Sequence, residues 1–179
     1  MKTYFEISLS VYNLWLFTSV FLLLNFGFIV LFPKYNIKEF ITVPQLKGYT
    51  ILNKTTFYLM FLSSIFIPLK TENIFFYIGI VIFVIGIFLY AAAMLYFAIS
   101  EYHLPVTSGI YKFSRHPVYI SFFIIISGML LVTFSGFLFI IAFLHFYSLY
   151  FILNEEEKIC EKQYGNLYKD YKQKTRKLI

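Results

Sequence analysis

Polar side chains that could do chemistry gather in two short segments of a strongly apolar chain. The first segment, residues 106–119, carries Arg115 and His116 directly before Pro117, a residue typical of the first turn of a helix. Free backbone N–H groups and the helix dipole favour an anion at such a position. The second segment carries three consecutive glutamates, residues 155–157, with tyrosines following them. Together these groups suit a ligand with an anionic group at one end, a cationic group at the other and a flat ring between.

The second segment is predicted to continue as a polar helix to about Lys174. Steps of three or four residues place five side chains on one face of this helix: Glu157, Cys160, Tyr164, Tyr168 and Tyr171. Glu156 points about 100° away, on the same side as His145. A purely structural interpretation stays open, in which the tyrosines only dock the tail. His145 alone is more often a hydrogen-bonded interior histidine than a catalytic one.

The amino-acid composition indicates the class of protein to which these polar groups belong. Only 13% of the residues are charged and 60% are hydrophobic, with 24 Phe and 16 Tyr, and the mean hydropathy is +0.75. A soluble domain has about 25% charged residues, so this composition excludes a water-soluble or disordered protein. The single cysteine, Cys160, excludes an internal disulfide and a Cys-rich metal site, and no metal is expected.

Four apolar runs predict the membrane-spanning helices: residues 7–32, 55–69, 73–100 and 117–154. The last run is nearly twice as long as one span needs, so it must fold back, most plausibly at residues 133–136. The prediction is an all-α, polytopic membrane protein of one domain, residues 1–179, with about five transmembrane helices. Three spans lie in residues 1–100. Residues 101–179 hold the polar loop, a helical hairpin and a cytoplasmic amphipathic tail helix.

Basic residues predict which end of each span faces the cytoplasm. Five spans divide the 15 Lys and Arg residues 13 to 2 between the two sides. Because cytoplasmic loops collect basic residues, the N-terminus is predicted outside and the C-terminus in the cytoplasm. The net charge of +6 is therefore a topology signal, and no nucleic-acid partner is expected. Both polar segments then lie at the cytoplasmic edge. A compact chain without a targeting extension favours a prokaryotic cytoplasmic membrane.

Two motifs give the chain a family resemblance. The first is Thr107-Ser108-Gly109-Ile110-Tyr111 followed by Arg115-His116-Pro117-Val118-Tyr119, and the second is Glu156-Glu157, Tyr164-Gly165, Tyr168 and Tyr171. In this order, flanking a hairpin of suitable length, they resemble the isoprenylcysteine carboxyl methyltransferase and phospholipid methyltransferase superfamily of integral membrane enzymes. The resemblance covers roughly the C-terminal 75 residues.

The resemblance implies S-adenosylmethionine as cofactor and a lipophilic acceptor that enters from the bilayer, such as an isoprenylcysteine-type carboxylate or a related lipid. Arg115 and His116 would hold the methionine carboxylate, with Tyr111, Pro117 and Tyr119 in the same cofactor-binding segment. Glu156 and Glu157 would engage the amino or ribose end of the cofactor, or the tail helix. Arg115 and Glu157 are also expected to be catalytic, Glu157 as the base if the acceptor is an amine.

The C-terminal end departs from the family pattern. Many members end in a Val-Pro-Arg segment whose arginine contributes to the active site, whereas this chain has Thr175-Arg176-Lys177. Arg176 or Lys177 could take that role, and Lys177 is our expected catalytic residue. Two other functions stay open. Cys160 with Tyr164-Gly165 also resembles the sterol double-bond reductases, which use NADPH, and the altered end would suit a non-catalytic lipid-binding scaffold.

Overall fold

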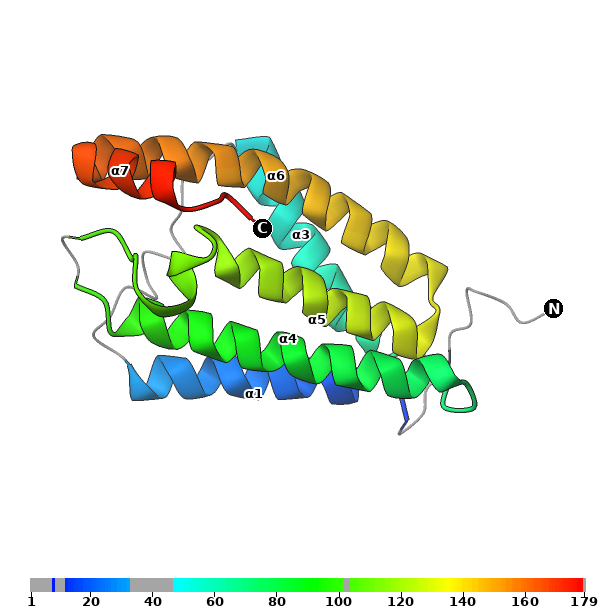
Figure 1. The fold of residues 1–179 in the computed structure, drawn as a ribbon. Helices are drawn as coiled ribbons and strands as arrows, with labels where there is room; N and C mark the ends of the chain where they lie inside the picture. The colour runs from blue at the N-terminus through cyan, green and yellow to red at the C-terminus, as the bar shows by residue number, and fades with distance from the viewer. Residues whose placement is uncertain (1–7, 9–11, 33–46, 102–103, 179) are drawn as a thin grey trace.

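The computed structural model describes residues 8, 12–32, 47–101 and 104–178. These residues form helices and connecting segments and contain no β-strand, which confirms the predicted all-α class (Figure 1). The elements are α1 (Trp15–Leu31), α3 (Lys47–Ser64), α4 (Ile74–Ala98), the 3-10 helix η1 (Gly109–Lys112), α5 (Pro117–Thr133), α6 (Gly136–Tyr164) and α7 (Asn166–Lys174).

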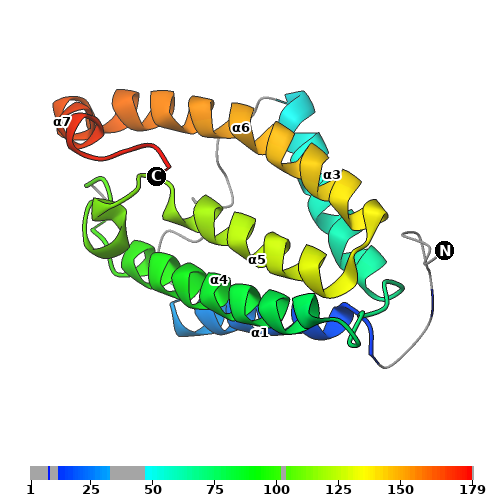
Figure 2. The ribbon, with the colours of Figure 1, turned by 45° about the vertical axis from the view of Figure 1, so that its right-hand side comes forward.

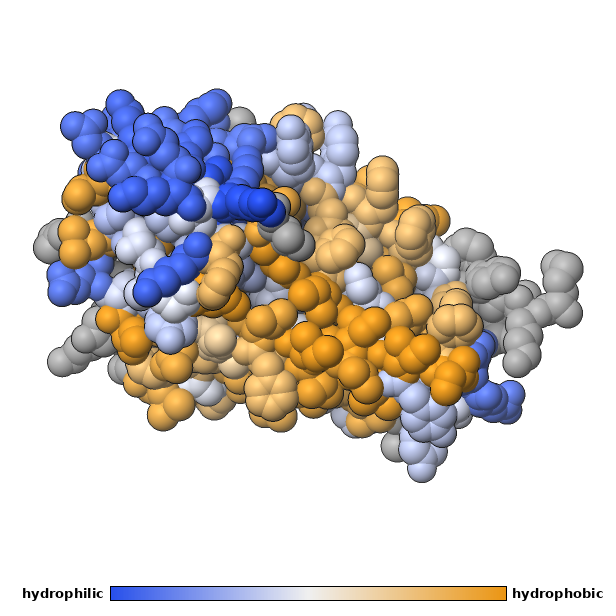
Figure 3. Space-filling model, viewed as in Figure 1, coloured by the Kyte–Doolittle hydropathy of each residue, from blue (hydrophilic) through white to orange (hydrophobic). Residues whose placement is uncertain are grey.

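Two of the described helices, α4 and α6, are long and apolar enough to cross a membrane. α1 and α5 are shorter apolar helices of 17 residues each. Figure 3 shows hydrophobic side chains over the face formed by α4 and α5, and hydrophilic ones gathered at the end where α7 lies. The apolar part of α6 ends at Leu153, so its last turns extend beyond the stretch that lipid would cover. The count of five spans stays a prediction.

The predicted bounds of the spans hold to different degrees. The run 73–100 coincides closely with α4, and α1 lies within the run 7–32, of which residues 7 and 9–11 lie outside the described residues. The predicted span 55–69 corresponds to a helix with different bounds, because α3 begins at Lys47 and ends at Ser64. A charge-free window misses the start of this helix because Lys54 is exposed on its surface, where a lysine costs little.

The turn between α5 and α6 confirms the predicted fold-back at residues 133–136. Phe134 adopts a left-handed conformation with φ 47°, which stops α5 after Thr133. The hydroxyl of Ser135 accepts a hydrogen bond from the N–H of Leu138 at 3.2 Å and caps α6. This turn gives the two apolar helices opposite directions.

The hairpin helices diverge from their turn and pack on different partners. α5 packs closely on α4, where a Cβ at Gly128 would lie 2.7 Å from the backbone nitrogen of Phe83. α6 packs mainly on α3 instead. Figure 2 shows α5 and α6 moving apart from the turn, with α1 and α4 on the side of α5. The open end of this hairpin is where the polar segments meet.

The predicted single polar helix to Lys174 is wrong, because the chain reverses at Gly165. This glycine has φ 57° and ψ −127°, a backbone conformation that side chains other than glycine rarely adopt. α6 therefore ends at Tyr164, and α7 folds back along it (Figures 1 and 2). The segment after α7 then returns towards the start of α5 and closes the open end of the hairpin.

Candidate active site

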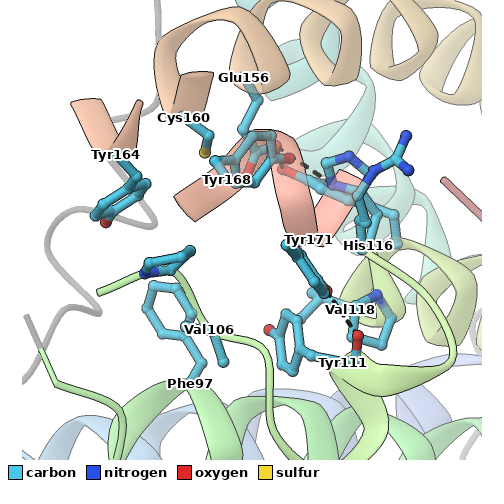
Figure 4. Close-up of a pocket in the computed structure, with 14 residues that line it drawn as sticks. Phe97, Val106, Tyr111, His116, Val118, Glu156, Cys160, Tyr164, Tyr168 and Tyr171 are labelled. Carbon is cyan, nitrogen blue, oxygen red and sulfur yellow. Dashed lines mark hydrogen bonds and ion pairs between the residues drawn. The ribbon is translucent and has the colours of Figure 1, made fainter. Parts of the chain in front are cut away.

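A pocket lies where the first and second polar segments face each other. Residues of η1, of the start of α5 and of the segment before η1 form one side, and residues of α6 and α7 form the other (Figure 4). Its empty volume is about 580 Å³, including the part open to solvent. We call it the α6–α7 pocket. All but two of the residues expected from sequence to act on a ligand line this pocket: Tyr111, Arg115, His116, Pro117, Tyr119 and Glu156. The two that do not line it are Glu157 and Lys177.

Aromatic rings form much of the wall of the α6–α7 pocket. Tyr111 and Phe97 lie on one side and Tyr164, Tyr168 and Tyr171 on the other (Figure 4). The Tyr171 hydroxyl donates to the carbonyl of Tyr111 at 2.6 Å, which ties α7 to η1. Burial raises the pKa of Tyr111 and of Tyr168, so both phenols are neutral. Phe97 was not expected from sequence, because nothing in an apolar helix marks the one ring that faces a site.

One face of α6 lines this pocket with Glu156, Cys160 and Tyr164, at steps of four residues. Of the five side chains predicted to share one face, Cys160, Tyr164, Tyr168 and Tyr171 line the pocket. Glu157 points towards Arg115 instead and does not line it. The predicted alignment of Glu156 with His145 holds, since His145, Leu149 and Ile152 continue the same face towards the hairpin turn.

Glu157 is the centre of a buried ion network. Arg115 donates from Nε to Oε1 at 2.8 Å, its Nη2 lies 2.7 Å from the same oxygen, and Nε2 of His116 lies 3.3 Å away. Nζ of Lys172 and of Lys177 lie 3.7 and 3.9 Å from Oε2. Burial alone would raise the pKa of Glu157, but the hydrogen bonds from His116 and Arg115 and the nearby positive charges lower it to about 2. Glu157 is therefore ionised at any physiological pH.

Arg115 also holds the chain end in place. Its Nη1 donates to the carbonyls of Lys172, at 3.1 Å, and of Thr175. Its backbone N–H donates to the carbonyl of Arg176 at 3.0 Å. The guanidinium thus connects the start of α5 with α6, α7 and the returning tail. Most of the donors that the resemblance assigned to a cofactor carboxylate are engaged within the protein.

Glu156 lies in a different environment from its neighbour. Its Oε2 accepts a hydrogen bond from the Tyr119 hydroxyl at 3.0 Å and lies 4.0 Å from Nδ1 of His116. Burial raises the pKa of Glu156, although the His116 charge and the Tyr119 hydrogen bond oppose the shift. A half-buried carboxylate with incomplete charge compensation faces the pocket, and a bound cation would complete it.

The chain end places its two basic residues differently. Nζ of Lys177 donates to Oδ1 of Asn154 at 2.6 Å and approaches Glu157, whereas Arg176 lines a groove on the other side of the tail. Ser114 donates from Oγ to the carbonyl of Lys177 at 3.2 Å. Of the two, Lys177 belongs to the ion network. Sequence reasoning did not single out Asn154, Ser114 or Lys172 for these contacts, because only the reversal at Gly165 brings them together.

A second space, the interhelical cavity, lies between α1, α3, α4, α5 and α6 and measures about 1460 Å³ including its open parts. Tyr119 lines both this cavity and the α6–α7 pocket. Most of its wall is apolar, but it contains His145, whose Nδ1 lies 3.3 Å from Nδ2 of Asn53 and 3.0 Å from Oγ1 of Thr56. His145 is thus a hydrogen-bonded interior histidine. The buried Thr50 hydroxyl has no hydrogen-bond partner among the described residues.

The described residues contain no group of three or more His, Cys, Asp or Glu side chains that could hold a metal ion. A sequence model of the family described as phospholipid methyltransferase matches residues 74–167, which run from the start of α4 to the start of α7. The match covers more than half of the chain and includes both polar segments up to Leu167. No curated protein matches the chain.

Proposed function

We propose, since the chain belongs to the phospholipid methyltransferase family within the isoprenylcysteine and phospholipid methyltransferase superfamily, that it transfers a methyl group from S-adenosylmethionine to a lipid acceptor at a membrane face. Family membership makes it a methyltransferase associated with membranes and lipid-type substrates. The cofactor, the residue roles and the topology are our proposal. We place the N-terminus outside and the C-terminus in the cytoplasm because of the predicted division of basic residues. The described basic residues of η1, of the last turns of α6, of α7 and of the chain end lie at the end of the bundle that holds the α6–α7 pocket.

The chemistry of the α6–α7 pocket fits S-adenosylmethionine. When bound, this cofactor supplies a methyl group on a positively charged sulfur. Glu156 offers the half-buried negative charge that such a cation needs, and the rings of Tyr111 and Tyr168 offer faces for a cation or a flat base. The raised pKa of Glu156 supports this role, because an incompletely compensated carboxylate gains most from a cationic ligand.

Arg115, Glu157 and Lys177 are best described as positioning residues. Their contacts fix α6, α7 and the tail over the pocket, and of the three Arg115 alone lines it. His116 lies between the two glutamates and lines the pocket, so it connects this network to the ligand. Closing the pocket with α7 excludes water and aligns donor and acceptor, which is most of what an in-line methyl transfer requires.

The acceptor is proposed to occupy the interhelical cavity. The observation that carries the proposal is the position of Tyr119, which lines both this cavity and the α6–α7 pocket and hydrogen-bonds Glu156. A lipid chain among the apolar walls would bring its head group to Tyr119. The buried Thr50 hydroxyl, which has no hydrogen-bond partner among the described residues, lines the same cavity and would donate to a lipid carbonyl oxygen.

An amine acceptor would need a base, and Glu156 is better placed for this role than Glu157. With a pKa of about 2, Glu157 holds a proton too weakly to act as a general base near neutral pH. Glu156 has a raised pKa and faces the pocket. Glu156 would take the proton that an amine nitrogen loses when it receives the methyl group. A carboxylate acceptor would not need this step.

The other two functions make different demands on the molecule. A sterol-type reductase would bind NADPH, whose phosphates need free cationic groups, while the cations beside the pocket, Arg115, Lys172 and Lys177, are paired with Glu157. A scaffold without activity would need no pocket adjoining the interhelical cavity. The family match and the shared position of Tyr119 both favour the methyltransferase.

The test is transfer of labelled methyl from S-adenosylmethionine into lipid. The purified protein is incubated with a total lipid extract and the organic phase is counted. We expect label in lipid with the wild type, a loss of at least tenfold with Glu156→Gln, and little change with Glu155→Gln, whose side chain pairs with Lys158 at the surface. Absence of label with a folded wild-type protein that binds the cofactor would contradict the proposal.

A further inference from the structure

A second groove opens on the opposite side of the tail from the α6–α7 pocket. It measures about 980 Å³ including its open part and lies between α4, η1, the start of α5 and the chain end. We call it the tail groove. Its floor is apolar, with Leu89, Ile110 and Ile120, and the side chain of Phe113 beside it is 79% exposed.

Three basic side chains surround this apolar floor. Lys112 comes from η1, Lys174 from the end of α7 and Arg176 from the tail. Within the described part of the chain, none of the three side chains has an ion-pair or hydrogen-bond partner, and no acidic residue lines the groove. The groove therefore combines an uncompensated positive rim with a surface that water solvates poorly.

The position of the groove matches the boundary between lipid and water. Figure 3 shows hydrophilic side chains at the end where α7 lies, directly beside the hydrophobic face of α4 and α5. Phe113, Leu89 and Ile120 continue that hydrophobic face, while the cations face the hydrophilic end. An anionic head group with acyl chains satisfies both parts at once, because each basic residue near a membrane surface attracts anionic lipid.

We propose that the tail groove binds an anionic phospholipid, with its phosphate among Lys112, Lys174 and Arg176 and its acyl chains along α4 and α5. This lipid is distinct from the methyl acceptor, and its binding does not depend on the proposed reaction. Glycerol-linked phosphate without acyl chains would lack the apolar contact and bind far more weakly.

The bound lipid would also stabilise the closed α6–α7 pocket. The tail that supplies Arg176 to the groove is the segment whose carbonyls accept hydrogen bonds from Arg115 and Ser114. A lipid bound to Lys174 and Arg176 on one side of this segment therefore stabilises the same tail conformation that Arg115 stabilises from the other side. Anionic lipid should raise cofactor affinity as well as thermal stability.

The experiment compares lipid binding by the full chain in detergent, using native mass spectrometry and thermal unfolding. The probes are a phosphatidylglycerol, a phosphatidylcholine of the same chain length, and glycerol phosphate. The variant Lys112→Gln/Lys174→Gln/Arg176→Gln is compared with Lys158→Gln/Lys162→Gln/Lys169→Gln, which removes the same charge from exposed positions outside the groove.

We expect phosphatidylglycerol to bind about tenfold more tightly than phosphatidylcholine and to raise the unfolding temperature. The groove variant should lose this preference and the control variant should keep it. Equal losses in both variants would show only general surface charge and would overturn the proposal. The same conclusion would follow if glycerol phosphate stabilised the protein as much as the lipid, or if the wild type showed no preference.

Discussion

Arg115 and Glu157, separated by 42 residues, form a two-contact ion pair in which Nε and Nη2 of the arginine approach the same carboxylate oxygen at 2.8 and 2.7 Å. Both side chains are less than a tenth exposed. The pair joins the start of α5 to α6, and Arg115 extends the connection to α7 and the tail. The pair is therefore the most buried link at the closed end of the α6–α7 pocket, where the hydrogen bonds of Tyr171 and Lys177 also hold α7 and the tail.

Replacing Arg115 should destabilise the protein strongly. Arg115→Gln leaves Glu157 buried without its main counter-charge, at a cost of about 3 kcal/mol, or about 6–12 °C for a chain of this size. Arg115→Lys should rescue little, because an ammonium cannot contact Glu157 and two carbonyls together. Thermal unfolding in detergent measures both variants. Lys158→Gln, which breaks an exposed pair, should change the midpoint by no more than about 2 °C, and an equal fall in that control would refute the argument.

The stabilisation from Glu157 should disappear in acid. Its pKa is about 2 in the folded protein against an ordinary value of 4.5, so its ionised form favours folding above pH 4.5. This contribution is lost as the pH falls from 4.5 towards 2. The difference in unfolding midpoint between wild type and Glu157→Gln should be constant from pH 7 to 6 and shrink clearly by pH 3. A difference that persists unchanged at pH 3 would mean that the pair does not lower this pKa.

Gly165 should be required for closure of the pocket. Gly165→Ala places a side chain at φ 57°, ψ −127°, which costs about 1–3 kcal/mol and favours continuation of α6 as a straight helix. We expect faster tryptic cleavage among the lysines of α7 and weaker cofactor binding. Gly48→Ala is the matched control, because Gly48 lies within α3 and a Cβ there meets nothing within 4 Å. Equal protection of both variants from trypsin would contradict the role of Gly165.

Filling the interhelical cavity should lower turnover of the lipid acceptor without changing the affinity for the cofactor. Leu149→Trp adds bulk at a cavity wall, so acceptor turnover at fixed lipid concentration should fall about tenfold while S-adenosylmethionine affinity stays within twofold. Leu144→Trp adds the same ring at a partly exposed position outside the cavity and should leave both unchanged. Acceptor turnover that survives in Leu149→Trp would place the lipid elsewhere.

Sequence reasoning predicted the parts of the fold that depend on local pattern. The apolar run of α4, the fold-back at residues 133–136 and the meeting of the two polar segments follow from hydrophobic length, turn residues and hairpin geometry. The prediction of one continuous polar helix to about Lys174 was wrong, because the chain reverses at Gly165. Hydrophobic spacing carries no information on such a reversal, although a glycine before a polar helix was a usable signal.

The candidate site was predictable in its residues and less so in their roles. Arg115, His116 and both glutamates do come together, as the motifs suggested. Which glutamate faces the pocket depends on a rotation of α6 by one residue, and this rotation is set by the tertiary pairing of Glu157 with Arg115. Phe97 and Lys172 could not be identified in advance, because their contacts come from long-range packing.

The most direct test is equilibrium binding of S-adenosylmethionine, S-adenosylhomocysteine and NADPH to the purified protein. We predict micromolar binding of the first two and none of NADPH. Glu156→Gln should weaken S-adenosylmethionine more than S-adenosylhomocysteine, because only the former carries a charged sulfur, while Glu155→Gln should affect neither. Binding of NADPH alone, or of none of the three to folded protein, would contradict the assignment of the α6–α7 pocket.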